Sequence, residues 1–230
     1  MWHLKKKTQI LGLLYGFLLF QILGGAYTTV WEQAVQVDAV SDNVPPKIAL
    51  TFDDGPNALY TPELLDGLKE RGVKATFFLV GVNIEKDDNA LIVKRMAQEG
   101  HLIGNHTFHH VELTKLDTID ALEELEETNL LIERITGDSV QFVRPPFGEW
   151  SKTLGEDVTM FPVMWSIDPL DWSVKNTEEI VRKVVTQAKE NDMILLHDCY
   201  QTSVEAALQI VDILQQQGFE FVTVDELLLP

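Results

Sequence analysis

The chain has 230 residues, 45% of them hydrophobic and 23% charged, which is the composition of an ordinary globular protein with a sizeable core. Its formal net charge of −18 at pH 7 argues against binding of nucleic acid, or of an anionic membrane surface, by the folded part. Because Cys199 is the single cysteine, the fold cannot contain an internal disulfide.

The N-terminal segment differs in character from the rest of the chain. Lysines at positions 5–7 precede an apolar stretch at residues 10–30, and a basic flank before such a stretch predicts an export signal. The stretch is long enough to form an N-terminal hydrophobic helix that spans a bilayer. We therefore expect residues 1–31 to be a signal or membrane anchor and the protein to be extracytoplasmic. Cleavage near the small residues 24–26, followed by secretion, is the alternative.

The remaining chain divides into a linker at residues 32–46 and a catalytic domain at residues 47–230. The linker is polar and ends in Pro45-Pro46, which favours an extended backbone. In the domain, short apolar runs alternate with amphipathic stretches. The runs predict strands at residues 48–52, 75–80, 102–104, 141–143, 163–167, 193–196 and 221–223. The amphipathic stretches predict a helix that starts at residues 61–62 and further helices at residues 91–99, 119–135, 177–188 and 203–217.

This alternation predicts an α/β fold with parallel strands covered by helices, and the number of elements fits a (β/α) barrel. In such barrels the catalytic groups lie at the carboxyl ends of the strands. Asp53, His106, Arg144, Asp168 and His197 follow the first, third, fourth, fifth and sixth expected strands. We therefore expect these polar side chains to gather at one face of the barrel.

Two histidines and two carboxylates in these clusters suit a metal site. His106 and His110 are four residues apart, so on a helical turn both rings would face one side and could reach one metal ion. A histidine-rich surface loop is the alternative. Asp53 and Asp54 are adjacent at a strand end, so their side chains diverge. One can bind the metal while the other acts as general base, and their spacing does not decide which.

Two further residues suit acid–base chemistry, although each has a structural alternative. Arg144 enters a Pro-Pro turn and is either part of the site or a structural ion pair. His197 ends an apolar run, where a lone histidine is often only a hydrogen-bonded core residue. Alternatively, Asp171 could hold its second ring nitrogen, so that the ring stays protonated and donates a proton to a leaving amine. Cys199 is a possible nucleophile, but the metal constellation competes for that role and makes an incidental cysteine the better interpretation.

The clusters read TFDDGP at 51–56, HTFHH at 106–110, RPPFG at 144–148, DPLDW at 168–172 and LLHD at 195–198. Together and in this order they resemble the polysaccharide deacetylases of carbohydrate esterase family 4, which share the NodB homology domain. The resemblance covers roughly residues 47–226. It implies a distorted (β/α) barrel, often incompletely closed, and an N-deacetylase similar to those acting on peptidoglycan or chitooligosaccharides.

The resemblance also implies roles for individual residues. It makes Asp53 the general base and Asp54 a metal ligand beside His106 and His110, and it has Arg144 orient the base.

Further roles follow from the later motifs. The backbone N–H of Phe147, where family members usually carry Tyr, would stabilise the oxyanion. Asp171 would orient the general acid His197, while Asp168 is more peripheral. Trp165 and Leu195 match residues that line the pocket for the acetyl methyl group, although the sequence alone would make both ordinary core residues.

The expected function is that of a metal-dependent hydrolase that removes acetyl groups from N-acetylated amino sugars in a cell-surface polysaccharide. The substrate would be peptidoglycan or another N-acetylglucosamine polymer. A ligand set of two histidines and one aspartate favours zinc, with cobalt and manganese as alternatives. An O-acetyl esterase acting on xylan-like glycans would use the same residues. A non-catalytic, surface-anchored glycan-binding module is the alternative from another class. We expect a monomer.

Overall fold

The structure is a computed structural model that describes residues 44–150, 154 and 158–229. The predicted N-terminal helix at residues 1–31 and nearly all of the predicted linker lie outside the described residues. Within the described ranges, no helix is both long and apolar enough to cross a membrane. Residues from Pro45 onward form one compact unit.

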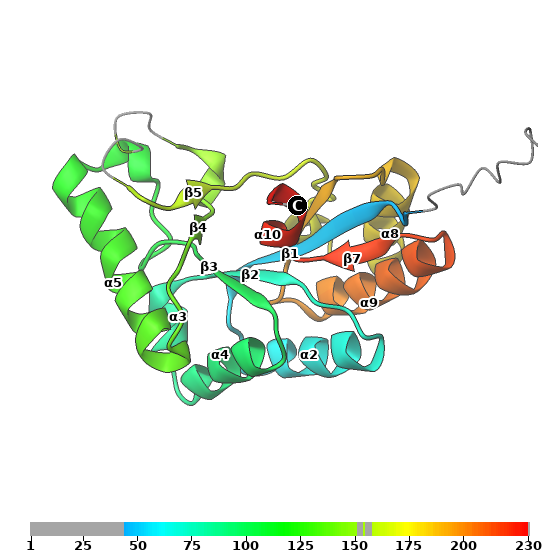
Figure 1. The fold of residues 1–230 in the computed structure, drawn as a ribbon, viewed down its shortest axis with the longest axis horizontal. Helices are drawn as coiled ribbons and strands as arrows, with labels where there is room; N and C mark the ends of the chain where they lie inside the picture. The colour runs from blue at the N-terminus through cyan, green and yellow to red at the C-terminus, as the bar shows by residue number, and fades with distance from the viewer. Residues whose placement is uncertain (1–43, 151–153, 155–157, 230) are drawn as a thin grey trace, which may run out of the picture. The chain divides into compact units, whose positions relative to one another are not determined.

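A single parallel sheet organises this unit (Figure 1). Its order is β5-β4-β3-β2-β1-β6, and β7 pairs with the first residues of β1. One isolated parallel bridge joins Ile167 to Ile194 of β6, so the segment that follows β5 returns to the other end of the sheet. The architecture is therefore a distorted, incompletely closed (β/α) barrel, and the predicted fold class is confirmed. The strands are β1 (Lys47–Gly55), β2 (Thr76–Leu79), β3 (Leu102–Asn105), β4 (Phe142–Val143), β5 (Phe161–Pro162), β6 (Met193–His197) and β7 (Glu220–Val222).

Helices cover the outside of the sheet, and Figure 1 shows α5, α4, α2 and α9 following one another around it. Their ends show ordinary capping chemistry. Asp117 accepts hydrogen bonds from the first turn of α5, and Gly137 ends that helix with a φ of 85°. The α-helices are α2 (Tyr60–Glu70), α3 (Gly81–Ile84), α4 (Asn89–Gln98), α5 (Thr118–Thr136), α7 (Asp171–Val174), α8 (Thr177–Gln187), α9 (Gln201–Gln216) and α10 (Val224–Leu228). The described residues also contain two 3₁₀ turns, η1 (Leu113–Lys115) and η2 (Pro146–Gly148).

The predicted strand at residues 163–167 is wrong. The pairing instead stops at β5, Phe161–Pro162, and resumes only at the Ile167 bridge. The reason lies in the hydrogen bonds of the intervening carbonyls. The guanidinium of Arg144 donates to the carbonyl oxygens of Val163 and Met164, at 3.2 and 3.1 Å. A buried arginine therefore takes acceptors that a regular strand would offer to its neighbour.

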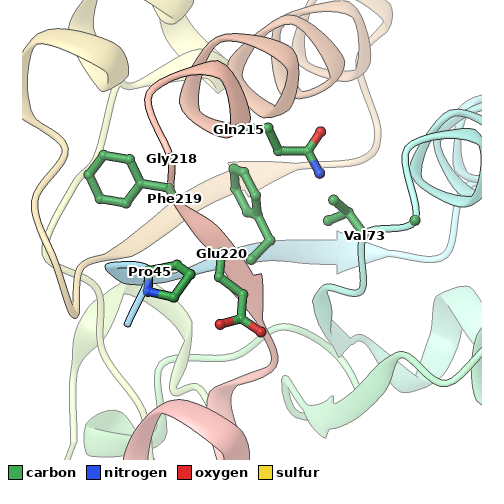
Figure 2. A pocket seen from close by; sticks show the side chains of 8 residues that line it. Pro45, Val73, Gln215, Gly218, Phe219 and Glu220 are labelled. Carbon is green, nitrogen blue, oxygen red and sulfur yellow. The ribbon is translucent and has the colours of Figure 1, made fainter. Parts of the chain in front are cut away.

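A hollow of about 410 Å³ lies at the amino end of the barrel, where the chain enters β1 (Figure 2). Its lining includes Pro45, Val73 and Phe219, and Glu220 is its one charged residue. A single carboxylate with no second titratable group beside it does not supply the combination of acid, base and metal ligands that this kind of catalysis requires. Asp53 and Asp54 lie near the other end of β1, which directs attention to the carboxyl face of the sheet.

The buried imidazole of His101 makes the fold sensitive to acid. Its Nδ1 accepts a hydrogen bond from the backbone N–H of Ala75 at 3.1 Å, and burial lowers the pKa of His101 to about 4. The unfolded chain takes up this proton near pH 6.5. The contribution of His101 to the free energy of unfolding is therefore complete above pH 6.5. It is lost as the pH falls toward 4, and the loss amounts to about 3 kcal/mol at 1.36 kcal/mol per pKa unit.

We expect denaturant titrations of the wild type to show this loss between pH 6.5 and 4. The variant His101→Gln keeps an acceptor oxygen but cannot titrate, so its unfolding free energy should fall less steeply over the same range. Parallel curves for the two proteins would assign the acid sensitivity to other groups.

Candidate active site

A cavity of about 440 Å³ opens at the carboxyl ends of the strands. Its walls come from the ends of β1 and β6 and from the segments that follow β3, β4, β5 and β6. This is the face where barrels of this type place their reactive groups. The lining residues are Asp53, Asp54, His106, His110, Pro145, Phe147, Trp165, Asp168, Leu170, Trp172, Leu195, His197 and Tyr200.

The two adjacent aspartates occupy the last residues of β1, which runs further than predicted, to Gly55. Asp53 is 3% exposed and its carboxylate meets Arg144. Asp54 has a left-handed φ of 69°, which turns its side chain away from that of Asp53. The side-chain amide of Asn83 on α3 donates to the backbone carbonyl of Asp54 at 2.7 Å and supports this conformation. The two carboxylates therefore point to different partners, Arg144 and His110, and both approach Nε2 of His106, at 3.7 and 3.5 Å.

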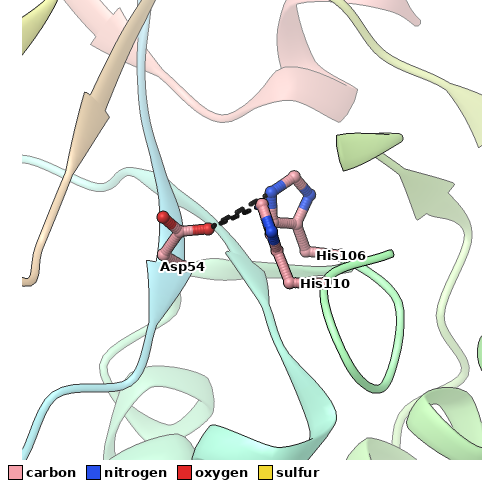
Figure 3. Close-up of side chains that lie close together, drawn as sticks. All are labelled: Asp54, His106 and His110. Atoms are coloured by element: carbon pink, nitrogen blue, oxygen red, sulfur yellow. Dashed lines mark ion pairs between the residues drawn. The ribbon is translucent and has the colours of Figure 1, made fainter. Parts of the chain in front are cut away.

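Asp54, His106 and His110 converge on one point. Oδ1 of Asp54 lies 3.5 Å from Nε2 of His106 and 3.2 Å from Nε2 of His110. One candidate ligand atom from each residue lies within 4.8 Å of the other two. Figure 3 shows both imidazoles on the same side of Asp54, with the dashed lines meeting at its carboxylate. Three donors at this spacing could bind one divalent ion and leave positions open for water and substrate.

The chemistry of these three donors fits a metal ion. Oδ1 of Asp54 is buried and has no hydrogen-bond partner among the described residues. Nδ1 of His106 lies 2.6 Å from the carbonyl oxygen of Arg144, so it carries the proton and leaves the Nε2 lone pair facing Asp54. Burial lowers the pKa of His110 and so favours its neutral, ligating form.

The predicted helical turn between His106 and His110 is wrong. The segment is a loop, in which Thr107 and His110 have left-handed φ values of 63° and 57°. Hydrogen bonds to neighbouring elements hold the loop in place, instead of the hydrogen bonds that a helical turn would form within itself. The side chain of Asn105 accepts from the N–H of Thr107, and Glu124 accepts from the N–H groups of the two residues that follow. The i, i+4 spacing still brings both rings to Asp54, by a different backbone path.

Arg144 is fully buried behind the general-base candidate. Its Nη1 donates to Oδ1 of Asp53 at 2.8 Å and to the hydroxyl of Thr51 at 2.7 Å. The guanidinium carbon lies 4.2 Å from the centre of the Phe78 ring. Burial lowers the pKa of Arg144, although its pairing with Asp53 opposes the shift. A bond of this kind to Oδ1 fixes the orientation of the Asp53 carboxylate.

His197 and Asp171 form a second acid–base pair. Nδ1 of His197 lies 2.8 Å from Oδ1 of Asp171, and the backbone N–H of His197 donates to Oδ2 at 2.8 Å. Asp171 is 0% exposed, at the start of α7. Burial by itself lowers the pKa of His197, but the hydrogen bond and charge of Asp171 outweigh it and raise that pKa to about 9. The ring is therefore cationic at neutral pH and can donate a proton.

The three residues expected to bind substrate line the same cavity. Phe147 lies in the η2 turn with a φ of 62°, and its ring is 4.9 Å from that of His110. Its side chain is largely exposed, while Leu195 is buried in β6. Trp165 packs beside Gly148, where an added Cβ would lie 3.2 Å from the indole. These side chains give the cavity an apolar wall beside the polar groups.

Several lining residues were missed by the sequence analysis. Trp172 directly follows Asp171 and is half exposed at the cavity, so an aromatic residue next to a catalytic candidate was the available signal. Tyr200, three residues after His197, also lines it. Cys199 does not, and burial raises its pKa to about 12, so its thiol is neutral at physiological pH and does not suit a nucleophile.

Comparison with known proteins places this chain in a family. The sequence model of the family described as polysaccharide deacetylase matches residues 41–163. The chain belongs to the polysaccharide deacetylase family. Its solved relatives include the peptidoglycan deacetylase PdaC from Bacillus subtilis, with a TM-score of 0.77 and 40% sequence identity over 80% of this chain and 90% of that one.

Proteins named as peptidoglycan deacetylases are also similar to this chain in sequence. The peptidoglycan-N-acetylmuramic acid deacetylase PdaC of Bacillus subtilis (strain 168) is 42% identical over 180 residues, which is 78% of this chain. The peptidoglycan-N-acetylglucosamine deacetylase PgdA of Listeria monocytogenes is 38% identical over 181 residues, or 79% of this chain. The matched part spans 38% of the length of each of these two relatives.

Proposed function

We propose that this chain is a metal-dependent N-deacetylase that removes acetyl groups from N-acetylated amino sugars of a cell-surface polysaccharide, with peptidoglycan as the polymer. One observation carries the proposal. A three-ligand metal site, a buried carboxylate held by arginine and a cationic histidine held by aspartate all face a single cavity. Metal-assisted hydrolysis of an amide uses these three functions in one place.

Asp54, His106 and His110 would hold the metal ion, and two imidazoles with one carboxylate favour zinc over cobalt or manganese. Bound there, a divalent ion polarises the amide carbonyl and lowers the pKa of a water molecule. The position of Asp54 suits a metal ligand, because its buried Oδ1 faces both imidazoles.

Asp53 acts as the general base in this proposal. It takes a proton from the attacking water, whose oxygen forms a bond to the carbonyl carbon. The carboxylate is suited to that role because Arg144 binds one of its oxygens, Oδ1, from behind and leaves Oδ2 facing the side of His106, at 3.7 Å from Nε2. The arginine also compensates the buried negative charge, which would otherwise be costly.

His197 acts as the general acid. When the carbon–nitrogen bond breaks, the departing sugar amine takes a proton from Nε2 of the ring, and acetate is the second product. Asp171 fixes the ring through Nδ1 and keeps it charged, which leaves Nε2 as the donor. The backbone N–H of Phe147 would donate to the oxygen on which negative charge develops. The acetyl methyl group would pack against Leu195 and Trp165.

The polymer and the location are inferred from the relatives and from the sequence. Two relatives are named for peptidoglycan sugars, one for N-acetylmuramic acid and one for N-acetylglucosamine, which favours peptidoglycan and leaves the choice of sugar open. The basic and apolar N-terminal segment fits an extracytoplasmic protein anchored in the membrane, or secreted after cleavage. All proposed site residues come from one chain, so a monomer suffices.

Two alternatives use the same scaffold. An O-acetyl esterase on xylan-like glycans needs the same base and metal, but its alcohol leaving group depends less on a cationic acid than an amine does. The cationic state of His197 therefore favours the amide. A non-catalytic glycan-binding module would not need a buried, arginine-held carboxylate beside a metal site, since that arrangement costs free energy without contributing to binding.

We expect the purified protein to release acetate from peptidoglycan faster than from chitin oligomers or acetylated xylan, assayed side by side. Removal of metal by a chelator should abolish release, and added zinc should restore it. The measurement is acetate produced per mole of protein, with the apoprotein as the control. Release from xylan alone would establish the esterase instead, and no release from any of the three by the zinc-loaded protein would favour the binding module.

A further inference from the structure

The loop that carries both histidine ligands has an unfavourable backbone conformation. Thr107 and His110 are not glycines, yet both have left-handed φ values, of 63° and 57°. Such conformations are unfavourable for residues other than glycine and persist only where neighbouring groups impose them. The geometry of the metal site therefore depends on groups outside the loop.

Glu124, in the second turn of α5, supplies the densest set of contacts to this loop. Its Oε2 accepts hydrogen bonds from the backbone N–H groups of Phe108 and His109, at 2.9 and 2.8 Å. Its Oε1 lies 2.7 Å from Nδ1 of His109. The carboxylate side chain is only 14% exposed. Successive N–H groups directed at one anion form a nest, and bonds to a charged acceptor are the stronger kind.

The position of these bonds in the loop matters as much as their number. Phe108 and His109 lie between His106 and His110, so the carboxylate binds the loop midway between its two ligands. The helix itself is tied to the strand that leads into the loop. The side chain of Asn105, at the end of β3, donates to the carbonyl oxygen of Leu125 on α5 at 2.8 Å. The loop is thus held at its start and at its middle by one helix.

The ion pair with His109 is a minor part of this arrangement. The His109 side chain is 57% exposed, and ion pairs of exposed groups contribute little to stability. The same contact directs Nδ1 of His109 toward Glu124 rather than toward the metal site. The two backbone bonds are therefore the main contacts of Glu124 with the loop, and the His109 side chain adds little to them. The start of α3 binds the loop from its other side, where the N–H groups of Gly81 and Val82 donate to the carbonyl oxygens of Thr107 and Phe108, at 3.1 and 2.9 Å.

We propose that Glu124 is a positioning residue that imposes the conformation of residues 106–110 and thereby sets the affinity of the site for its metal. The proposal rests on the proposed function to the extent that this site holds a metal ion. Partners that orient metal ligands from behind typically change affinity by about 10–100-fold when they are removed. Glu124 does so through backbone bonds between the ligands rather than through a ligand's own side chain.

The test is the zinc affinity of the full chain, measured by competition with a chelator and without substrate. We expect Glu124→Ala to weaken zinc binding by about 10–100-fold, and Glu124→Gln, which keeps one acceptor oxygen, to weaken it by a smaller factor. His109→Ala removes only the exposed pair and should bind zinc like the wild type. Glu123→Ala removes an equal charge from an exposed position on the same helix and should also leave affinity unchanged.

The melting temperature of each metal-free variant separates positioning from stability. A Glu124→Ala protein that melts earlier but binds zinc as tightly as the wild type would overturn the proposal. If Glu124→Ala does not fold, Glu124→Gln carries the test, and wild-type zinc affinity in that variant would overturn it equally. A wild type that binds zinc with this dependence on Glu124 but releases no acetate would refute the proposed function and leave this inference standing.

Discussion

Replacing Asp53 with asparagine is expected to lower the rate of acetate release by about 10²–10⁴-fold, the range typical of a lost general base. Asparagine has nearly the shape of aspartate but cannot accept the proton of the attacking water. Zinc affinity should stay close to that of the wild type, because the three candidate ligands are Asp54, His106 and His110. The measurements are turnover on peptidoglycan fragments and zinc content of the purified variant.

The matched control is the same substitution one residue later. Asp54→Asn should lose both zinc and activity, since Asp54 supplies the carboxylate that both imidazoles face. Asp53→Asn also leaves the buried guanidinium of Arg144 without a counter-charge, so its melting temperature should be measured as well. If Asp53→Asn lost zinc and Asp54→Asn kept it, the two roles would have to be exchanged.

Replacing His197 with alanine should lower kcat by a similar factor, about 10²–10⁴-fold, with zinc content unchanged. The imidazole contributes its proton to the departing amine and is not among the three candidate ligands. A zinc-loaded His197→Ala protein with near-normal turnover would show that the proton comes from another group.

The pH dependence gives a second, independent check on this residue. The pKa of His197 is raised to about 9, and the protonated ring is the active acid. Activity should therefore persist through neutral pH and fall as pH rises past about 9. In Asp171→Asn the ring loses the charge that favours imidazolium, so its pKa should drop toward the ordinary value near 6.5. The alkaline limb of the rate profile should move to lower pH, and a limb that stays in place would contradict this assignment.

The fold class could be predicted from the sequence because the spacing of apolar residues along the chain indicates which side chains are buried. The first strand is a continuous apolar run, and Ile48, Leu50 and Phe52 are all buried in the structure. The prediction of a long helix at residues 119–135 agrees with the structure to within one residue at each end. Gly137 is a strong signal for its end, and in the structure Asp117 caps its start. Short elements such as α7 and η2 have no periodicity to detect. The strand expected at residues 163–167 does not form, because Arg144, which is distant in the sequence, donates hydrogen bonds to the carbonyl oxygens of Val163 and Met164.

At the candidate site, the residue types and their order were predictable, while their local geometry was not. The structure brings Asp54, His106 and His110 together as the motifs suggested. A spacing of four residues fits a helical turn and a strained loop equally well, so it could not show that the loop is held by Glu124. That contact joins residues far apart in the sequence, as does the bond from Asn83 to Asp54. Such support is visible only in three dimensions.

The buried guanidinium of Arg144 also constrains how the protein can reach its folded state. Its four hydrogen bonds join β4 to β1, through Thr51 and Asp53, and to the carbonyls of Val163 and Met164. A nascent chain that has emerged only as far as β3 would have to bury the carboxylate of Asp53 without a counterion. We therefore expect that the first half of the barrel does not fold on its own and that folding is completed only after residues beyond 164 have left the ribosome.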